Sequence, residues 1–189
     1  MEAPSERNKI ILSRKKSALL LIDIQEKILA VMNNPEQVVT NSLKLIKGFK
    51  TLNIPIFYTE QYPKGLGSTA EPLLHELEGL SPIQKMSFSC SGAGNFFTRL
   101  IDNNVSQVVI AGIECHVCVQ QTALDLIVSG FQVDVAADSV SSRKEIDYRI
   151  ALDRMRAHKI EISTSEAILF ELLNVCGTDE FREISKIIR

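Results

Sequence analysis

Two cysteines and a histidine stand together in the stretch Cys115-His116-Val117-Cys118, one residue after the apolar run "VVIAGI". A Cys-x-x-Cys pair is typical of a redox disulfide or of half a zinc site. Alternatively, Cys118 is a single catalytic nucleophile at the start of a helix that follows a buried strand. There, the helix dipole and free backbone N–H groups are expected to lower the pKa of the thiol and to bind an anion.

The rest of the chain offers little support for zinc or redox chemistry. A structural zinc site needs four ligands, usually with a second closely spaced pair. Cys90 and Cys176 are isolated, and His75 and His158 stand in expected helices. A thioredoxin-like Cys-x-x-Cys would normally follow an early strand of a smaller domain. Neither G-x-G-x-x-G nor G-x-x-x-x-G-K-[ST] occurs, so nucleotide binding has no support in the sequence. We therefore expect no bound metal, cofactor or nucleotide.

The elements that would position these residues alternate between strand and helix from end to end. Apolar runs predict strands at 18–24, 54–60, 83–85, 106–113, 132–140 and 159–164. Helical periodicity predicts helices at 41–52, 94–104, 116–129, 145–158 and 165–173, with Gly130 as the C′ residue of the third. This alternation predicts an α/β fold, a three-layer α/β/α sandwich with a mostly parallel central sheet. No linker divides the chain, so residues 1–189 are expected to form a single domain.

Polar residues end several of the predicted strands, and ligands of parallel sheets bind at that edge. Asp23 ends the first strand, Lys85 the third, and Cys118 follows the fourth; the 59–62 loop and Asp138 are further candidates. Taken singly, these are ordinary residues: a helix cap, a surface lysine and a small core side chain. Together they supply a base, a cation and a nucleophile that can reach one point.

Composition and charge narrow the classes of partner. Hydrophobic residues make up 45% of the chain, which favours a sizeable core. The net charge is −2, so the sequence has no excess of positive charge that would attract nucleic acid or an anionic membrane. The apolar run Ala18–Ile22 is too short to span a bilayer. Glu2, Glu6 and Arg7 stand where a signal peptide would carry a long apolar run. We therefore expect a cytoplasmic protein with free thiols.

Four segments carry a resemblance to a known family: "ALLLIDIQ", "PIFYTEQYPKGLGST", "IQKMSFSC" and "VVIAGIECHVCVQQTALDLIVSGFQVDVAADSVSSR". In this order, over about Ala18–Phe170, they resemble the isochorismatase-like cysteine hydrolase family. The segment Val108–Ser142 is the most specific of them. "GIExHxCV" with "TEQYPKGLG" most resembles the branch called isochorismatase-domain-containing proteins.

The resemblance implies an Asp-Lys-Cys catalytic triad, and Asp23, Lys85 and Cys118 fill its three positions. It also implies a cis, non-proline peptide bond between Ile113 and Glu114. In the family this bond turns a backbone N–H toward the site, so the N–H groups of Glu114 and Cys118 would form the oxyanion hole. A small-molecule substrate and a homo-oligomer, dimeric or larger, are further implications.

Two departures from the family's patterns refine the expected reaction. Its nicotinamidases bind a metal through an Asp and several His residues in the loop after the second strand, whereas residues 59–63 here read "TEQYP". Its isochorismatases that cleave a vinyl ether do not rely on a cysteine at the Cys118 position. Hydrolysis of an amide-like C–N bond through a thioester acyl-enzyme is therefore expected, without a metal.

Contacts to the substrate are expected from Gln25, Tyr62 and Phe88, while His116 is expected to point away from the thiol. Two other classes stay open. The fold can serve as a binding or scaffolding module with an idle site, or Cys115 and Cys118 can form a redox pair. The intact triad argues against an idle site, because a scaffold has no chemical need for all three residue types.

Overall fold

The central element of the fold is a parallel β-sheet. The computed structural model describes residues 7–189, and Glu2 and Glu6 lie outside the described residues. Within this part, six strands pair in parallel in the order β3-β2-β1-β4-β5-β6. The strands are β1 (Ser17–Ile22), β2 (Ile56–Gln61), β3 (Ile83–Lys85), β4 (Gln107–Ile113), β5 (Gln132–Ser141) and β6 (Glu161–Ser163).

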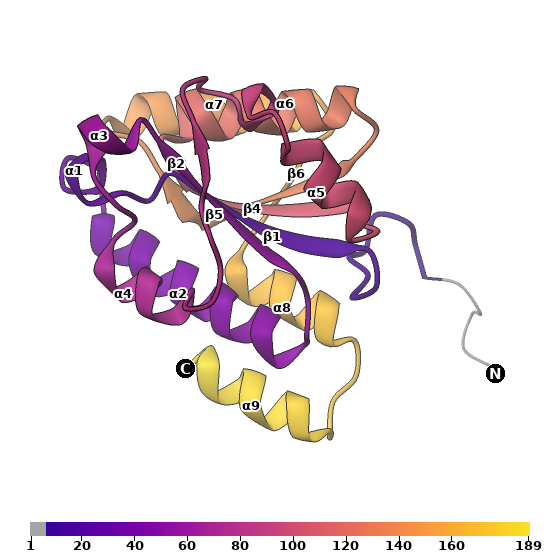
Figure 1. The fold of residues 1–189 in the computed structure, drawn as a ribbon. Helices are drawn as coiled ribbons and strands as arrows, with labels where there is room; N and C mark the ends of the chain where they lie inside the picture. Colours follow the sequence, from indigo (N-terminus) through magenta and orange to yellow (C-terminus); the bar gives the residue numbers. More distant parts are fainter. Residues whose placement is uncertain (1–6) are drawn as a thin grey trace.

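Helices cover both faces of the sheet (Figure 1), which confirms the predicted three-layer α/β/α sandwich. One face carries α2 (Pro35–Thr51), α4 (Glu71–Glu76), α8 (Ser165–Leu173) and α9 (Asp179–Ile187), and the other carries α5 (Phe96–Asp102), α6 (Gln120–Val128) and α7 (Glu145–Ala157). Short turns complete the connections: α1 (Glu26–Leu29), α3 (Pro63–Leu66), a 3-10 turn (Cys90–Gly92) and a π-helical turn (Cys115–Val119). Across residues 7–189, no helix combines the length and apolarity needed to cross a bilayer.

The middle strand β1 explains why the sequence forms a buried sheet. Leu19 and Leu21 pack into the core beneath α2, whereas Leu20 and Ile22 pack into the core beneath α5 and α6. A strand covered on both faces is apolar at every position, which is why the run "ALLLI" is continuous. Fully burying each such leucine or isoleucine contributes about 1.5–3 kcal/mol.

Helix boundaries differ from the sequence predictions most clearly at three places. α2 begins at Pro35, earlier than predicted, because a proline is well suited to the first turn of a helix. The helix predicted at 116–129 begins as the π-helical turn and continues as α6, and Gly130 follows it with φ +87°, as the C′ position predicts. α9 was not predicted, although Thr178 caps it by accepting from the N–H of Phe181 at 3.0 Å.

The chain reverses its direction of travel across the sheet beside β1. It runs outward through β2 and β3, then returns to place β4 on the other side of β1. The connection after β1 leads to α2 on one face, and the connection after β4 leads to α6 on the opposite face. The carboxyl ends of β1 and β4 are therefore a topological switch point, where a parallel sheet leaves a crevice for ligands.

One buried carboxyl group lies away from this crevice. Asp134 on β5 is 4% exposed, and its Oδ1 accepts from Gln132 Nε2 at 3.1 Å. Burial raises the pKa of Asp134 to about 7, and the carboxylates of Glu171 and Glu161 add to the rise while the bond from Gln132 opposes it. This pKa is raised above that of aspartate in the unfolded chain. The stabilisation that comes from binding this proton is therefore fully present below the pKa of the unfolded chain and is lost as the pH rises through about 7.

Replacement of Asp134 by asparagine should therefore stabilise the protein selectively at high pH. We expect Asp134→Asn to raise the free energy of unfolding by on the order of 1–3 kcal/mol at about pH 8 and to change it little at about pH 4. Urea unfolding at both pH values measures the difference. Asp102→Asn, which makes the same change at an exposed position on α5, is the matched control and should change the free energy of unfolding little. Equal effects of Asp134→Asn at both pH values would contradict a raised pKa.

Candidate active site

A buried ion pair lies at the carboxyl edge of the sheet. Asp23 directly follows β1, and Lys85 is the last residue of β3; their side chains are 1% and 0% exposed. Lys85 Nζ donates to Asp23 Oδ2 at 2.6 Å, reaching across the intervening strand β2. The other carboxylate oxygen, Oδ1, accepts from the hydroxyl of Thr59 on β2 at 2.7 Å. The aspartate is therefore held in one orientation by two neighbouring strands.

The ammonium group of Lys85 has three further acceptors. They are Gln61 Oε1 at 2.8 Å, the carbonyl of Phe88 at 2.9 Å and the carbonyl of Ser87 at 3.2 Å. A buried ion pair is tolerated only when additional hydrogen bonds satisfy its remaining donors and acceptors. The end of β2 and the loop after β3 therefore hold the lysine in place.

Strand β4 brings the nucleophile candidate to the same edge. Gly112 has φ +140°, and a Cβ atom there would lie 2.2 Å from the carbonyl oxygen of Ile22, so only glycine lets β4 approach β1 this closely. One residue further on, the peptide bond between Ile113 and Glu114 is cis, at the position that the family resemblance implied. The π-helical turn follows and carries Cys118.

Cys118 opens onto a cleft of about 80 Å³ at the switch point between β1 and β4. The cleft is lined by Asp23, Ile28, Gln61, Leu66, Phe88, Ile113, Glu114, Val117 and Cys118. The thiol of Cys118 donates to Gln61 Oε1, with Sγ and the oxygen 3.9 Å apart. The structure thus brings the thiol and the Asp23 carboxylate to one cleft, with Lys85 bonded to that carboxylate.

The pKa of the Cys118 thiol is raised, whereas its place at the start of a helix predicted a lowered pKa. Burial is the largest cause, followed by the negative charge of Asp23; the ammonium of Lys85 opposes the rise but is outweighed. Cys118 is only 6% exposed, so forming a thiolate costs hydration that the cleft does not replace. Burial and the neighbouring carboxylate thus favour the neutral thiol, in contrast to the low pKa that the helix start predicted.

Gln61 is a site residue that the sequence analysis included only as part of the 59–62 loop, with no role of its own. Its Oε1 accepts from both Lys85 and the Cys118 thiol, and its Nε2 donates to the carbonyl of Met86 at 2.9 Å. The bond to Met86 fixes which end of the amide faces the cleft. The only signal in the sequence was its place at the end of a predicted strand, on the edge where ligands bind.

Of the three predicted substrate contacts, the structure places one at the cleft. Phe88 lines the cleft and is 56% exposed. Gln25 is fully buried: its Oε1 accepts from the N–H of Gln61 at 2.8 Å, and its Nε2 donates to the carbonyls of Gln61 and Gly67. The ring of Tyr62 lies against Gly65 and outside the cleft lining. The side-chain amide of Gln25 is fully engaged in these bonds, so Gln25 holds the backbone of Gln61 in place and is not free to contact a substrate.

The side chains that flank the nucleophile are bonded elsewhere. Nδ1 of His116 lies 2.9 Å from the hydroxyl of Ser142, in keeping with the prediction that it points away from the thiol. The Glu114 carboxylate accepts from Arg143 Nε at 2.9 Å. Both charged side chains that line the cleft, Asp23 and Glu114, therefore already have a cationic partner.

The remaining cysteines differ in how deeply they are buried. Cys115 and Cys90 are fully buried, and burial is the main reason that the pKa of each rises to about 12. All four cysteines are free thiols. In the described residues, 7–189, no group of three or more His, Cys, Asp or Glu side chains is placed to hold a metal ion.

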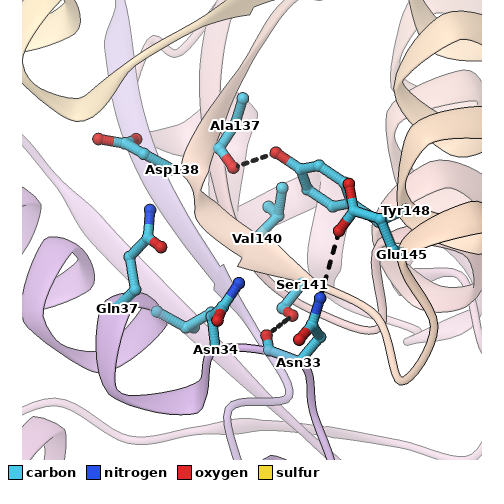
Figure 2. A pocket seen from close by; sticks show the side chains of 10 residues that line it. Asn33, Asn34, Gln37, Ala137, Asp138, Val140, Ser141, Glu145 and Tyr148 are labelled. Atoms are coloured by element: carbon cyan, nitrogen blue, oxygen red, sulfur yellow. Dashed lines mark hydrogen bonds between the residues drawn. The ribbon is translucent and has the colours of Figure 1, made fainter.

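A second, more polar cleft of about 200 Å³ lies between the start of α2 and the end of β5 (Figure 2). Asp138 lines it, but its carboxylate accepts from the N–H and hydroxyl of Ser165 and so caps α8. In the same cleft Tyr148 donates to the carbonyl of Ala137 at 2.8 Å. None of Asp23, Lys85 and Cys118 lines this cleft, so Asp138 is a structural residue here.

Comparison with known proteins agrees with the fold. The model of the Isochorismatase domain matches residues 17–167. The chain therefore belongs to the isochorismatase family and has the fold of that family's hydrolases. It is 39% identical over 177 residues to isochorismatase domain-containing protein 2 of Danio rerio, covering 94% of this chain and 89% of that protein.

Two solved structures are similar over nearly the whole chain. One, described as MAR1 ribonuclease from Caenorhabditis elegans, has a TM-score of 0.87 and 36% identity over 94% of this chain and 91% of that one. The other, an octameric hydrolase of unknown specificity from Escherichia coli, has a TM-score of 0.90 and 24% identity, covering 97% and 91%. The second likeness concerns the fold alone.

The raised pKa of Cys118 predicts an order of labelling by iodoacetamide. At about pH 7.5 the exposed Cys176 should react first, and the rate at Cys118 should keep rising to about pH 9 without a plateau, because thiolate is the reactive form. Peptide mass spectrometry after timed quenching separates the four sites. Fast labelling of Cys118 that levels off below about pH 7 would show a stabilised thiolate instead.

Proposed function

We propose that this protein is a cysteine hydrolase that cleaves an amide-like C–N bond of a small molecule through a thioester acyl-enzyme. One observation carries the proposal: the Cys118 thiol shares a cleft with the carboxylate of Asp23, which Lys85 holds at 2.6 Å. A nucleophile beside an oriented base is the arrangement that covalent acyl transfer needs.

In the first half-reaction, Asp23 takes the thiol proton as Cys118 Sγ attacks the carbonyl carbon. The new Sγ–C bond gives a tetrahedral oxyanion. When that intermediate collapses, the C–N bond breaks and Asp23 gives the proton to the leaving nitrogen, so a neutral amine departs and a thioester remains. Concerted proton transfer suits a thiol whose pKa is raised, because no free thiolate has to form first.

In the second half-reaction, Asp23 takes a proton from water as the water oxygen attacks the thioester carbon. The Sγ–C bond then breaks, the proton returns to Sγ, and the carboxylic acid leaves. The backbone N–H groups of Glu114 and Cys118 are the proposed oxyanion donors in both halves. A single such donor typically contributes about 10²–10³ in rate.

Lys85 and Gln61 are assigned supporting roles in this scheme. Lys85 orients the carboxylate and balances its charge, so that Asp23 acts as a base inside a buried site. Gln61 accepts from the thiol and thereby keeps Sγ directed at the cleft in the resting state. Phe88 borders the space where the acyl group would sit.

Other functions are less well supported. The name of the Caenorhabditis elegans neighbour includes ribonuclease, but the residues that line the Cys118 cleft include no Arg or Lys to contact phosphates. A redox role would require Cys115, which is fully buried, to reach Cys118. A scaffolding module would not need the thiol and the carboxylate in one cleft. Homo-oligomeric assembly and a cytoplasmic location remain expectations of the family resemblance and the composition.

The decisive test is ammonia or acid release from a panel of small amides and carbamates, with an RNA oligonucleotide included. We expect Cys118→Ala to abolish turnover of any substrate found, because no other group on the cleft can form the thioester. Cys176→Ala, which changes an exposed thiol away from the cleft, should turn over at the wild-type rate. Unfolding curves should show that both variants fold. The scheme is wrong if Cys118→Ala keeps the wild-type rate.

A second variant tests the role given to Gln61. Gln61→Met keeps the length of the side chain but removes the acceptor, so kcat should fall about 10–100-fold, the loss of a hydrogen bond to a charged group. A positioning role predicts that KM changes much less than kcat. If kcat is unchanged while only the stability falls, Gln61 supports the fold and not the reaction.

A further inference from the structure

We propose that the Cys118 cleft selects small, uncharged acyl groups, so that its substrates are small aliphatic amides rather than acidic or aromatic ones. The part of this proposal that concerns turnover rests on the proposed function. The selectivity of the cleft itself is a property of its lining and can be measured at the thiol without turnover.

The side chains around the thiol are mainly apolar. Ile28 comes from α1, Leu66 from α3, Phe88 from the loop after β3, Ile113 from the end of β4 and Val117 from the π-helical turn. Five hydrophobic side chains from five separate segments thus converge on the space in front of Sγ. An aliphatic group placed there loses contact with water and gains about 25 cal/mol for each Å² buried.

The charged groups at the cleft have no unused partner to offer a ligand. Asp23 is paired with Lys85, and Glu114 is paired with Arg143. A carboxylate on the substrate would lose its hydration beside two negative side chains, and an ammonium would have to compete with cations already in contact. A neutral group avoids both costs.

The volume of the cleft sets a size limit. At about 80 Å³ it is well below the roughly 300–1,000 Å³ of pockets that hold drug-sized ligands. One water molecule occupies about 30 Å³ of liquid, so the cleft has room for about three non-hydrogen atoms beyond the reacting carbonyl group. An aromatic ring would require Phe88 or Leu66 to move.

Two alkylating agents of nearly equal size measure the charge selectivity. Iodoacetamide is neutral and iodoacetate is anionic; both replace iodide with a bond to sulfur. At about pH 9, the ratio of their rates at Cys118 should exceed the same ratio at the exposed Cys176 by at least about tenfold, because only Cys118 lies in the desolvated cleft. Equal ratios at the two thiols would overturn the proposal.

A positive charge placed in the lining should remove most of the preference. Leu66→Lys adds a cation at a half-buried position of the lining, and it should lower the ratio at Cys118 to within about threefold of that at Cys176. Ile101→Lys places the same charge on α5, where Ile101 is 64% exposed and outside the lining, and should leave the ratio unchanged. An equal response to both variants would show that the selectivity does not originate in the cleft.

Turnover of matched amides separates this proposal from the proposed function. Isobutyramide is neutral and oxamate is anionic, with the same number of non-hydrogen atoms, and we expect kcat/KM for ammonia release to favour isobutyramide by at least about 100-fold. Equal rates would overturn the selectivity while leaving the hydrolase in place. Release from neither amide, together with selective alkylation of Cys118, would instead count against the hydrolase and leave the selectivity intact.

Discussion

The buried ion pair between Asp23 and Lys85 is the interaction on which the rest of the site depends. Removing two charges from water costs several kcal/mol for each ion, and their attraction offsets this only with good geometry and further hydrogen bonds. Thr59 and Gln61 on β2, and two carbonyls of the loop after β3, supply those bonds. The need to satisfy the buried charges therefore fixes the position of β2 and of the loop after β3. The same hydrogen bonds hold the Asp23 carboxylate beside the thiol.

The close approach of β4 to β1 decides where the nucleophile lies relative to that pair. Gly112 admits the carbonyl of Ile22 where any side chain would collide, so the end of β4 lies directly beside Asp23. The price of this proximity is a desolvated thiol next to a negative charge, and the pKa of Cys118 rises in consequence. The site thus holds a neutral thiol beside a base and not a preformed thiolate ion pair. The nucleophile then forms only when a substrate is bound.

The parts of the molecule that could be predicted from sequence are those that local patterns determine. The continuous apolar run of β1 and the periodicity of α8 indicate their elements directly, and strand ends pointed to Asp23, Lys85 and Cys118 as neighbours. Gln25 and Gln61 illustrate what such patterns do not contain. The amide of Gln25 is bonded to backbone groups, whereas the amide of Gln61 faces the thiol. Loop geometry sets this difference, and neither residue type nor spacing reveals it. The pKa of Cys118 depends on burial, which is likewise a tertiary property.

The polar groups at the cleft already have hydrogen-bond partners, and this limits the free energy that the site can gain from binding a ligand. Each carboxylate at the cleft has a cation, and the amide of Gln61 is bonded at both ends, so few polar groups remain to hold a ligand in its ground state. Apolar contact with a small acyl group adds only modest affinity, because little area is buried. Rate acceleration must then come from interactions that strengthen as the reaction proceeds, such as proton transfer to Asp23 and charge on the developing oxyanion. A site built in this way favours transition-state stabilisation over tight substrate binding.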